Sequence, residues 1–287
     1  MEKFIQYRTN DSLYDGPFDS NGWPAAGLGD VVVTENGCLI AIDGGQPNDA
    51  EDFVKLLEAQ TPGRKTVVDL WIITHPHLDH YGALQSICRN NELLNRITIK
   101  KLLWYFPVEF CNKAGETNIL GYGNNDMDEI CRLTGAIPHR PLRDEVINID
   151  GIEFHFIYVP DDCSFVNTAC GNANCVSLIF TVKGKNKKVM VTGDAHGRNM
   201  QITVWRYAKK LKCDILQMPH HFCCDSYCAE FYNCVAPQIV LEPTSIACNR
   251  AMHTQYSTYE GGIANLCVEA KAEKIYRAFE GTVELSI

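Results

Sequence analysis

The sequence lacks a long hydrophobic segment. No apolar run approaches the roughly 18 residues that a helix needs to cross a bilayer. The first residues, MEKFIQYRTNDSLYD, also contain neither the apolar core nor the cleavage site of a secretory leader. We therefore expect a soluble, cytoplasmic protein that has no membrane partner.

Positive charge is scarce: 26 Lys and Arg stand against 35 Asp and Glu, and the net charge is −9. This balance argues against broad, sequence-independent binding of nucleic acid. The 287 residues contain no internal repeat, low-complexity tract or linker, and the 46% hydrophobic content is typical of a folded globular protein. We predict a single domain over residues 1–287, with an N-terminal extension over residues 1–28 that is mostly loop. The expected partner is a small-molecule substrate, and the oligomeric state is open.

Paired metal-binding cysteine motifs are missing, although the chain has 14 cysteines. The spacing of Cys223, Cys224, Cys228 and Cys234 lacks a paired CxxC framework, so free thiols are favoured over a cysteine metal centre. Without a secretory leader, so many cysteines indicate a reducing compartment in which most thiols are free.

The apolar pattern mixes hairpins with strand–helix units. Two apolar runs joined at Asn36-Gly37 predict a hairpin, and similar signals lie at Asp150-Gly151 and at residues 184–186. The nearly continuous apolar run at residues 67–74 predicts a strand that is covered on both faces. This mixture favours an α/β fold of two sheets with outer helices over one doubly wound parallel sheet.

Three histidines and an aspartate lie within six residues, at His75, His77, Asp79 and His80. On an extended segment His75 and His77 point the same way, because side chains two apart share a face. The following turn into a helix lets Asp79 and His80 converge from another side. Imidazole nitrogen and carboxylate oxygen suit Zn(II), Mn(II) and Fe(II), so the cluster predicts a site for two neighbouring ions. The alternative is a surface loop that happens to be rich in histidine.

Residues 74–80, THPHLDH, match the HxHxDH signature, and in this the chain resembles the metallo-β-lactamase superfamily. The resemblance covers roughly residues 29–287. The segment VMVTGD, which ends at Asp194, is similar to the strand whose last Asp bridges two metals, and His220-His221 is similar to the last metal-binding motif. The resemblance implies a four-layer αββα sandwich with a metal site at one edge.

Within the superfamily, the chain is most similar to the hydrolase domain of bacterial competence (DNA-uptake) proteins and to related phosphorylcholine esterases. That branch has an AsnxxSer segment, here Asn174 to Ser177. Two positions depart from the pattern. Asn172 or Asn174 stands where glyoxalases and lactamases have a third histidine, and Phe222 stands where competence proteins usually have Gly after the paired histidine.

The resemblance assigns the metal ligands residue by residue. His75 and His77 would bind the first ion, and Asp194 would bridge to the second. Asp79, His80 and one of the paired histidines would bind the second ion. His220 is favoured over His221 because it comes directly after the strand and its proline, although the sequence does not separate the two.

Two divalent ions, expected to be Zn(II) with Mn(II) or Fe(II) as alternatives, would present hydroxide at neutral pH and polarise the substrate. Asp79 is expected to orient the attacking water. A histidine outside the ligand set, namely His221, His196 or His253, is expected to protonate the leaving group. The catalytic prediction is therefore Asp79 with His221.

The sequence thus predicts a metal-dependent hydrolase of a phosphodiester or phosphoester. The missing third histidine argues against glyoxalase and lactamase chemistry, and the acidic charge argues against a general nuclease. Three alternatives stay open: a thioester, lactone or β-lactam hydrolase, a degenerate metal-binding protein without turnover, and a di-iron oxidoreductase. For the last of these, the fused flavin domain that such a role would require is not found in the sequence.

Overall fold

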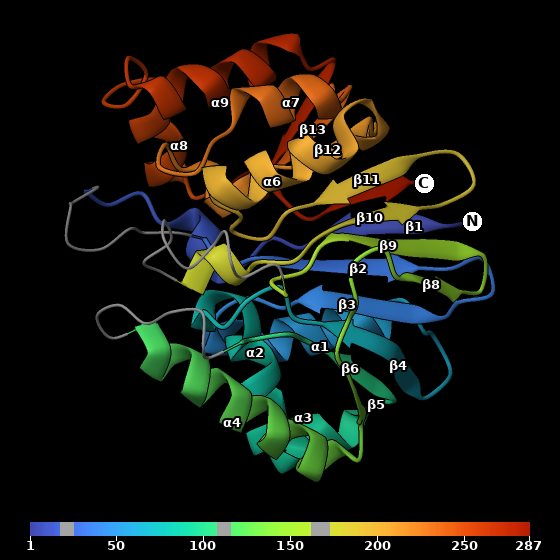
Figure 1. The fold of residues 1–287 in the computed structure, drawn as a ribbon. Coiled ribbons are helices and arrows are strands. Elements are labelled where there is room, and N and C mark those ends of the chain that lie inside the picture. The colour runs from blue at the N-terminus through green and yellow to red at the C-terminus, as the bar shows by residue number, and fades with distance from the viewer. Residues whose placement is uncertain (18–25, 108–115, 162–172) are drawn as a thin grey trace.

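The structure is a computed structural model, and it describes residues 1–17, 26–107, 116–161 and 173–287. Two mixed β-sheets pack face to face, and helices cover the outer face of each (Figure 1). The first sheet has the order β15-β1-β2-β3-β4-β6-β7, with β5 paired to β4. Its strands are β1 Lys3–Gln6, β2 Gly29–Val33, β3 Leu39–Asp43, β4 Thr66–Ile72, β5 Ile97–Ile99, β6 Lys101–Leu103, β7 Ile137–His139 and β15 Val283–Ser286.

The second sheet has the order β14-β13-β12-β11-β10-β9-β8. Strands β8 to β11 pair antiparallel, and β11 to β14 pair parallel. These strands are β8 Val146–Ile149, β9 Ile152–Tyr158, β10 Ile179–Lys183, β11 Lys188–Val191, β12 Ile215–Gln217, β13 Ile239–Glu242 and β14 Lys274–Arg277.

The helices form the two outer layers. Figure 1 shows α1 to α4 on the side of the first sheet and α6 to α9 on the side of the second. The α-helices are α1 Ala50–Ala59, α2 Leu78–Arg89, α3 Asn91–Arg96, α4 Glu116–Thr134, α6 Gly197–Tyr207, α7 Ala229–Val235, α8 Ile246–His253 and α9 Glu260–Lys271. Short 3-10 turns are η1 Asn10–Leu13, η2 Pro47–Asp49, η4 Ala173–Val176, η5 Ala208–Leu211, η6 Pro219–Phe222 and η7 Ala278–Glu280.

Strand β3 shows why the central strands are apolar along their whole length. Leu39 and Ala41 pack in the core beneath α1 to α4, whereas Ile40 and Ile42 pack in the core between the two sheets. Successive side chains of a strand point to opposite faces, so a strand with a core on each side needs apolar residues at every position. A third core lies between the second sheet and α6 to α9.

The predicted fold class, an α/β four-layer αββα sandwich, is confirmed. The three predicted hairpins are present as β2–β3, β8–β9 and β10–β11. The description of residues 1–28 as mostly loop is incomplete, because β1 pairs with β2 and β15 and buries Phe4 and Ile5. The prediction of a single domain stays a prediction.

Ten of the described cysteines are free, and Cys175 is disulfide-bonded. Cys111, Cys163 and Cys170 lie outside the described residues. Within the described parts of the chain, every helix is too short or too polar to cross a membrane.

Candidate metal centre

The four residues of the HxHxDH cluster lie where β4 ends and α2 begins. His77 is the N-cap of α2 and keeps an extended backbone, with φ −92° and ψ 144°. The rings of His75 and His77 consequently lie with their centroids 4.7 Å apart. Asp79 and His80 are on the first turn of α2, and His80 is fully buried. The structure therefore brings these four side chains together as expected.

Asp194 comes from the second sheet, just after β11. It is reached through Gly193, whose φ is +51°, a left-handed conformation that favours glycine. A Cβ atom at Gly193 would lie 2.8 Å from Cβ of Thr74, next to His75. The missing side chain thus lets the turn after β11 approach the end of β4, which brings the ligands of the two sheets together.

Asp194 belongs to two groups of candidate ligand atoms, each within 4.8 Å of one another. The first group is His75, His77 and Asp194, with 3.6 Å between Nε2 of His75 and Oδ2 of Asp194. The second is Asp79, His80, Asp194 and His221. There Nε2 of His80 is 3.1 Å from Oδ1 of Asp194, and Nε2 of His221 is 3.1 Å from Oδ2 of Asp79.

The structure places His221, and not the expected His220, in the second group. His221 is fully buried and is held by a hydrogen bond from Nδ1 to the carbonyl oxygen of Pro243, 3.1 Å away. His220 belongs to a third group with His196 and Asp225: its Nδ1 is 2.8 Å from Oδ1 of Asp225, while its Nε2 is 3.8 Å from Oδ2 of Asp194. The order of the two histidines along the chain does not decide which one faces Asp194.

The backbone at the paired histidines is unusual. His220, His221 and Phe222 all have positive φ, at 45°, 53° and 70°. Non-glycine residues in this region carry strain, and such strain is found most often at functional sites. Phe222 thus has a left-handed conformation that a glycine would adopt more easily.

Four buried atoms of this cluster have no hydrogen-bond partner in the described parts of the chain. They are Nε2 of His75, His80 and His221, and Oδ1 of Asp194. Buried polar atoms normally have a hydrogen-bond partner, so four unpaired atoms within one cluster indicate that the cluster binds a ligand. Imidazole nitrogens with carboxylates are the donors that divalent transition metals use, and the residues present therefore fit such ions.

Charges within the cluster oppose the effect of burial. Burial alone would lower the pKa of His221, but Asp194 and Asp79 raise it to about 10. Burial would raise the pKa of Asp79, yet His80 and His221 hold it below its usual value. For His75 burial prevails, and with the neighbouring His80 it keeps the pKa of the ring low. The neighbouring carboxylates thus favour the protonated form of His221, whereas burial favours the neutral form of His75.

Asp43, at the end of β3, holds the second group in place. Three donors converge on its carboxylate: the backbone N–H of Thr74 at 2.8 Å, the hydroxyl of Thr74 at 2.7 Å, and Nδ1 of His80 at 2.8 Å. A proton on Nδ1 of His80 leaves Nε2 as the lone pair that faces Asp194. The role of Asp43 in orienting His80 was not predicted from the sequence. Its signal in the sequence is an Asp that ends a strand before two glycines.

Asn174, in η4, lies near where a third histidine was expected. Its Nδ2 is 3.2 Å from Nε2 of His196 and 3.3 Å from Nε2 of His220. Asn172 lies outside the described residues. His253 is at the end of α8, where its Nε2 is 2.9 Å from Glu269, and it belongs to none of the three groups.

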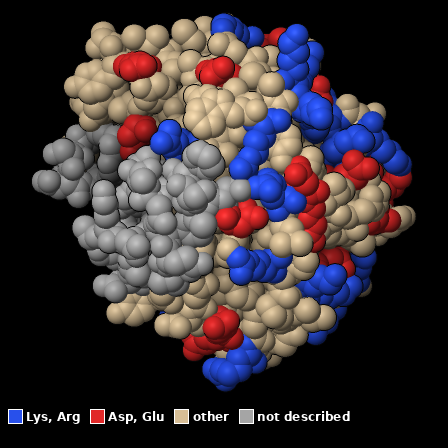
Figure 2. Space-filling view, viewed as in Figure 1, with Lys and Arg blue, Asp and Glu red and all other residues tan. Residues whose placement is uncertain are grey.

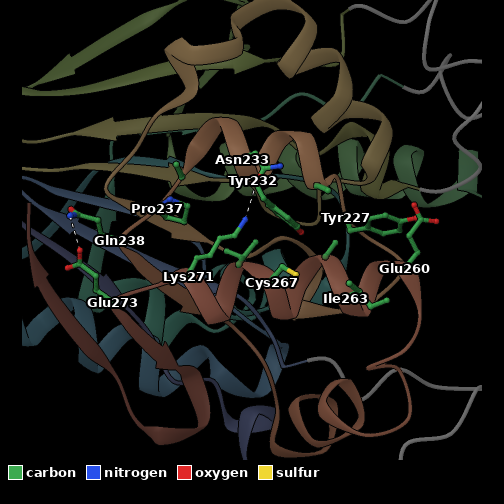
Figure 3. Close-up of a pocket in the computed structure, with 14 residues that line it drawn as sticks. Tyr227, Tyr232, Asn233, Pro237, Gln238, Glu260, Ile263, Cys267, Lys271 and Glu273 are labelled. Carbon is green, nitrogen blue, oxygen red and sulfur yellow. Dashed lines mark hydrogen bonds between the residues drawn. The ribbon is translucent and has the colours of Figure 1, made fainter.

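A cavity of about 600 Å³ lies between α7 and α9 (Figure 3). Apolar side chains such as Ile263 and Val268 line it, together with Lys271, Tyr227 and Glu260. None of its lining residues belongs to the three candidate ligand groups.

The sequence profile of the Metallo-beta-lactamase superfamily matches residues 30–231 of the chain. No curated protein sequence matches the chain. Among solved structures, Zn(2+)-bound PqqB from Methylobacterium extorquens is similar over 100% of this chain and 100% of that protein, with a TM-score of 0.58 and 10% identity.

Two further structures are similar over 99% of this chain. A diphosphatase from the PhnP family is matched over 98% of its length, with a TM-score of 0.52 and 15% identity. CmlA, a diiron β-hydroxylase from Streptomyces venezuelae, is matched over 54% of its length, with a TM-score of 0.53 and 13% identity. At such identities these likenesses concern the fold alone.

Proposed function

Because the chain belongs to the metallo-β-lactamase superfamily, we propose that it is a metal-dependent hydrolase that binds two divalent ions and cleaves a phosphodiester or phosphoester. The observation that carries this proposal is Asp194, which is shared by two ligand groups. Four buried atoms of these groups have no hydrogen-bond partner among the described residues. Zinc is the preferred ion, and manganese or iron would suit the same donors.

The ligand sets follow the two groups. His75, His77 and Asp194 hold the first ion, and Asp79, His80, Asp194 and His221 hold the second. His220 leaves the predicted ligand set, and His221 takes its place. When bound, two such ions act as Lewis acids that lower the pKa of coordinated water and stabilise charge that develops on the substrate.

Residues of the protein itself would orient the attacking water and protonate the leaving group. Asp79 is the least buried carboxylate of the second group, with 18% of its side chain exposed, and is placed to orient the attacking water. His221 is bonded through Nδ1 to the carbonyl oxygen of Pro243, and its Nε2 faces the carboxylates of the second group as a ligand atom, which removes it as the proton donor. The donor to the leaving group is instead His220, which Asp225 holds by Nδ1 beside the first group.

The choice of a phosphoester rests on residues and charge. The first group has no third histidine, which separates the chain from glyoxalases and lactamases. On the face drawn in Figure 2, Lys and Arg side chains lie among Asp and Glu, and the net charge is −9. This supports a small phosphodiester over a nucleic-acid strand. A diphosphatase is among the proteins of similar fold.

We place the chain nearest the competence-protein branch and the phosphorylcholine esterases. Support comes from Asn174 and Ser177 at the site, where the hydroxyl of Ser177 accepts a hydrogen bond from the backbone N–H of Asp194 at 3.2 Å. The proposed setting is the cytoplasm, and the proposed partner is a small molecule rather than a membrane.

Turnover of bis(p-nitrophenyl) phosphate by protein reconstituted with Zn(II) or Mn(II) tests the proposal. Asp79→Asn and Asp194→Asn should abolish turnover, because each removes a ligand charge. Asp52→Asn, at an exposed carboxylate on α1, is the matched control and should keep full activity.

Equal turnover in all three variants would contradict the proposed site. Hydrolysis of thioesters or lactones, without hydrolysis of any phosphoester, would contradict the proposed substrate class and indicate a thioesterase or lactonase. Stoichiometric metal without turnover of any ester would indicate a binding protein, and an iron signature in the spectra would indicate di-iron chemistry instead.

A further inference from the structure

A second polar feature lies at the same sheet edge as the metal centre. Strands β4, β6 and β7 are parallel neighbours, so their carboxyl ends meet at one edge. Strand β4 leads to His75, β6 leads to Trp104, and β7 leads to Arg140. In open α/β sheets, ligands bind at the carboxyl ends of the strands, so this whole edge is a candidate binding surface.

Between the ends of β6 and β7 is a cavity of about 460 Å³, here called the β6–β7 pocket. Its lining includes Trp104, Tyr105, Phe106, Asn124, His139 and Arg140. Strand β6 ends at Leu103, and of the three aromatic residues that follow, Tyr105 and Phe106 are buried whereas Trp104 is partly exposed. A volume in this range suits a small molecule or one arm of a larger substrate.

Hydrogen bonds and a cation–π contact hold the residues of the pocket wall in place. Nδ2 of Asn124 donates to the carbonyl oxygen of Phe106 at 2.6 Å, and Oδ1 of Asn124 accepts from Nε1 of Trp104 at 3.2 Å. The guanidinium carbon of Arg140 lies 3.6 Å from the centre of the Tyr105 ring, which is buried. One face of the guanidinium is therefore covered by an aromatic ring, and the exposed side chain leaves the other face for a ligand.

Arg140 has no ion-pair partner among the described residues. The nearby carboxylate of Glu145 is engaged by Nε2 of His139 at 2.9 Å. A planar cation backed by one ring stacks well against a second ring. This contact, with the aromatic wall of the pocket, favours a flat aromatic group over an aliphatic chain.

The pocket is close to the metal centre. Neighbouring strands are about 4.8 Å apart, so the two steps from β4 to β7 span about 10 Å. Phe106 also forms a wall near the metal loop: a Cβ atom at Gly123 would lie 2.7 Å from Pro76, between His75 and His77, and 3.3 Å from Phe106. This separation suits one substrate that has its phosphorus at the metals and a ring in the pocket.

We propose that the β6–β7 pocket binds the aromatic part of the substrate, an aryl or nucleobase ring that stacks on Arg140. The inference rests on the proposed function, because it takes the phosphoester to lie at the metal centre. It narrows the substrate class to phosphoesters that carry a flat ring.

Calorimetry with phosphonates tests the pocket without turnover. Metal-loaded wild-type protein should bind 4-phenylbutylphosphonate, whose four-carbon chain lets the ring reach the pocket while phosphorus lies at the metals, about tenfold more tightly than butylphosphonate, the size expected for a partly desolvated cation–π contact. Arg140→Gln should lose this preference, and Arg140→Lys should lose most of it because the ammonium has no planar face. Arg132→Gln, at an exposed arginine on α4, is the matched control and should keep the preference.

Equal binding of both phosphonates by the wild-type protein, or an unchanged preference in Arg140→Gln, would contradict the proposal that the β6–β7 pocket binds an aromatic ring. Comparison of adenosine 5′-monophosphate with ribose 5-phosphate shows whether a nucleobase serves as the ring. The two proposals can be contradicted separately. A preference for the phenyl compound without turnover of any phosphodiester would support the ring-binding pocket and contradict the hydrolase. Turnover without the preference would support the hydrolase and contradict the ring-binding pocket.

Discussion

Replacing Asp43 with Asn should weaken metal binding although Asp43 is not itself a proposed ligand. The two oxygens of Asp43 accept three hydrogen bonds, including one from Nδ1 of His80. If the asparagine amide group faces His80, donor meets donor, and the proton moves to Nε2 of His80. The nitrogen that faces Asp194 at 3.1 Å would then no longer offer a lone pair.

The size of the effect follows from the bond that is lost. A hydrogen bond to a charged group contributes roughly 1.5–3 kcal/mol, which corresponds to roughly a 10- to 150-fold loss of affinity. Loss of a group that orients a metal ligand typically costs about 10- to 100-fold, in agreement. Only the second ion should be affected, and titration of the metal-free protein with Zn(II) by competition against a chromophoric chelator would resolve the two steps.

Asp30 provides the matched control, because it is another buried carboxyl on the adjacent strand. Burial, reinforced by the nearby Asp43, raises the pKa of Asp30 well above its usual value. Asp30 belongs to none of the three candidate ligand groups, so Asp30→Asn should leave both affinities almost unchanged. Weaker metal binding in Asp30→Asn, or full affinity in Asp43→Asn, would refute this reasoning.

Three further outcomes are expected. His221→Gln should hold one zinc ion per chain and His220→Gln two, as counted by elemental analysis after reconstitution; the reverse would return His220 to the ligand set. In the metal-free protein the pKa of His221 is raised from 6.5 to about 10, so its stabilising charge is fully present below pH 6.5 and is lost as the pH rises through 10. Urea unfolding should show this loss, and zinc affinity should rise with pH because zinc displaces the proton. Gly193→Ala should destabilise the metal-free protein by about 1–3 kcal/mol, through its positive φ and a close contact, whereas Gly135→Ala, with open space around it, should cost about 1 kcal/mol.

Local spacing was enough to predict four of the six candidate ligands. His75 and His77 share a face because they are two apart on an extended segment, and the first turn of α2 adds Asp79 and His80. Each of these relations involves only neighbouring residues, and the structure keeps them. The two-sheet fold was likewise readable, because hairpin turns and continuous apolar runs are local patterns.

The remaining features depend on contacts between distant segments. His220 and His221 follow the same strand and proline, and both have a left-handed backbone, so only their contacts with distant segments, Asp225 for His220 and Pro243 for His221, distinguish their positions. Asp43 acts through the packing of β3 against the loop after β4, which no spacing encodes. Strand β1 forms because β15 arrives from the other end of the chain to pair with it.

The pairing of two ions across Asp194 is the central claim. Crystals of the zinc-loaded protein, measured on both sides of the zinc absorption edge, would locate each ion by anomalous scattering. We predict two peaks per chain on either side of Asp194, one beside His75 and His77, the other beside His80 and His221. A single peak, or a peak only among His196, His220 and Asp225, would contradict it.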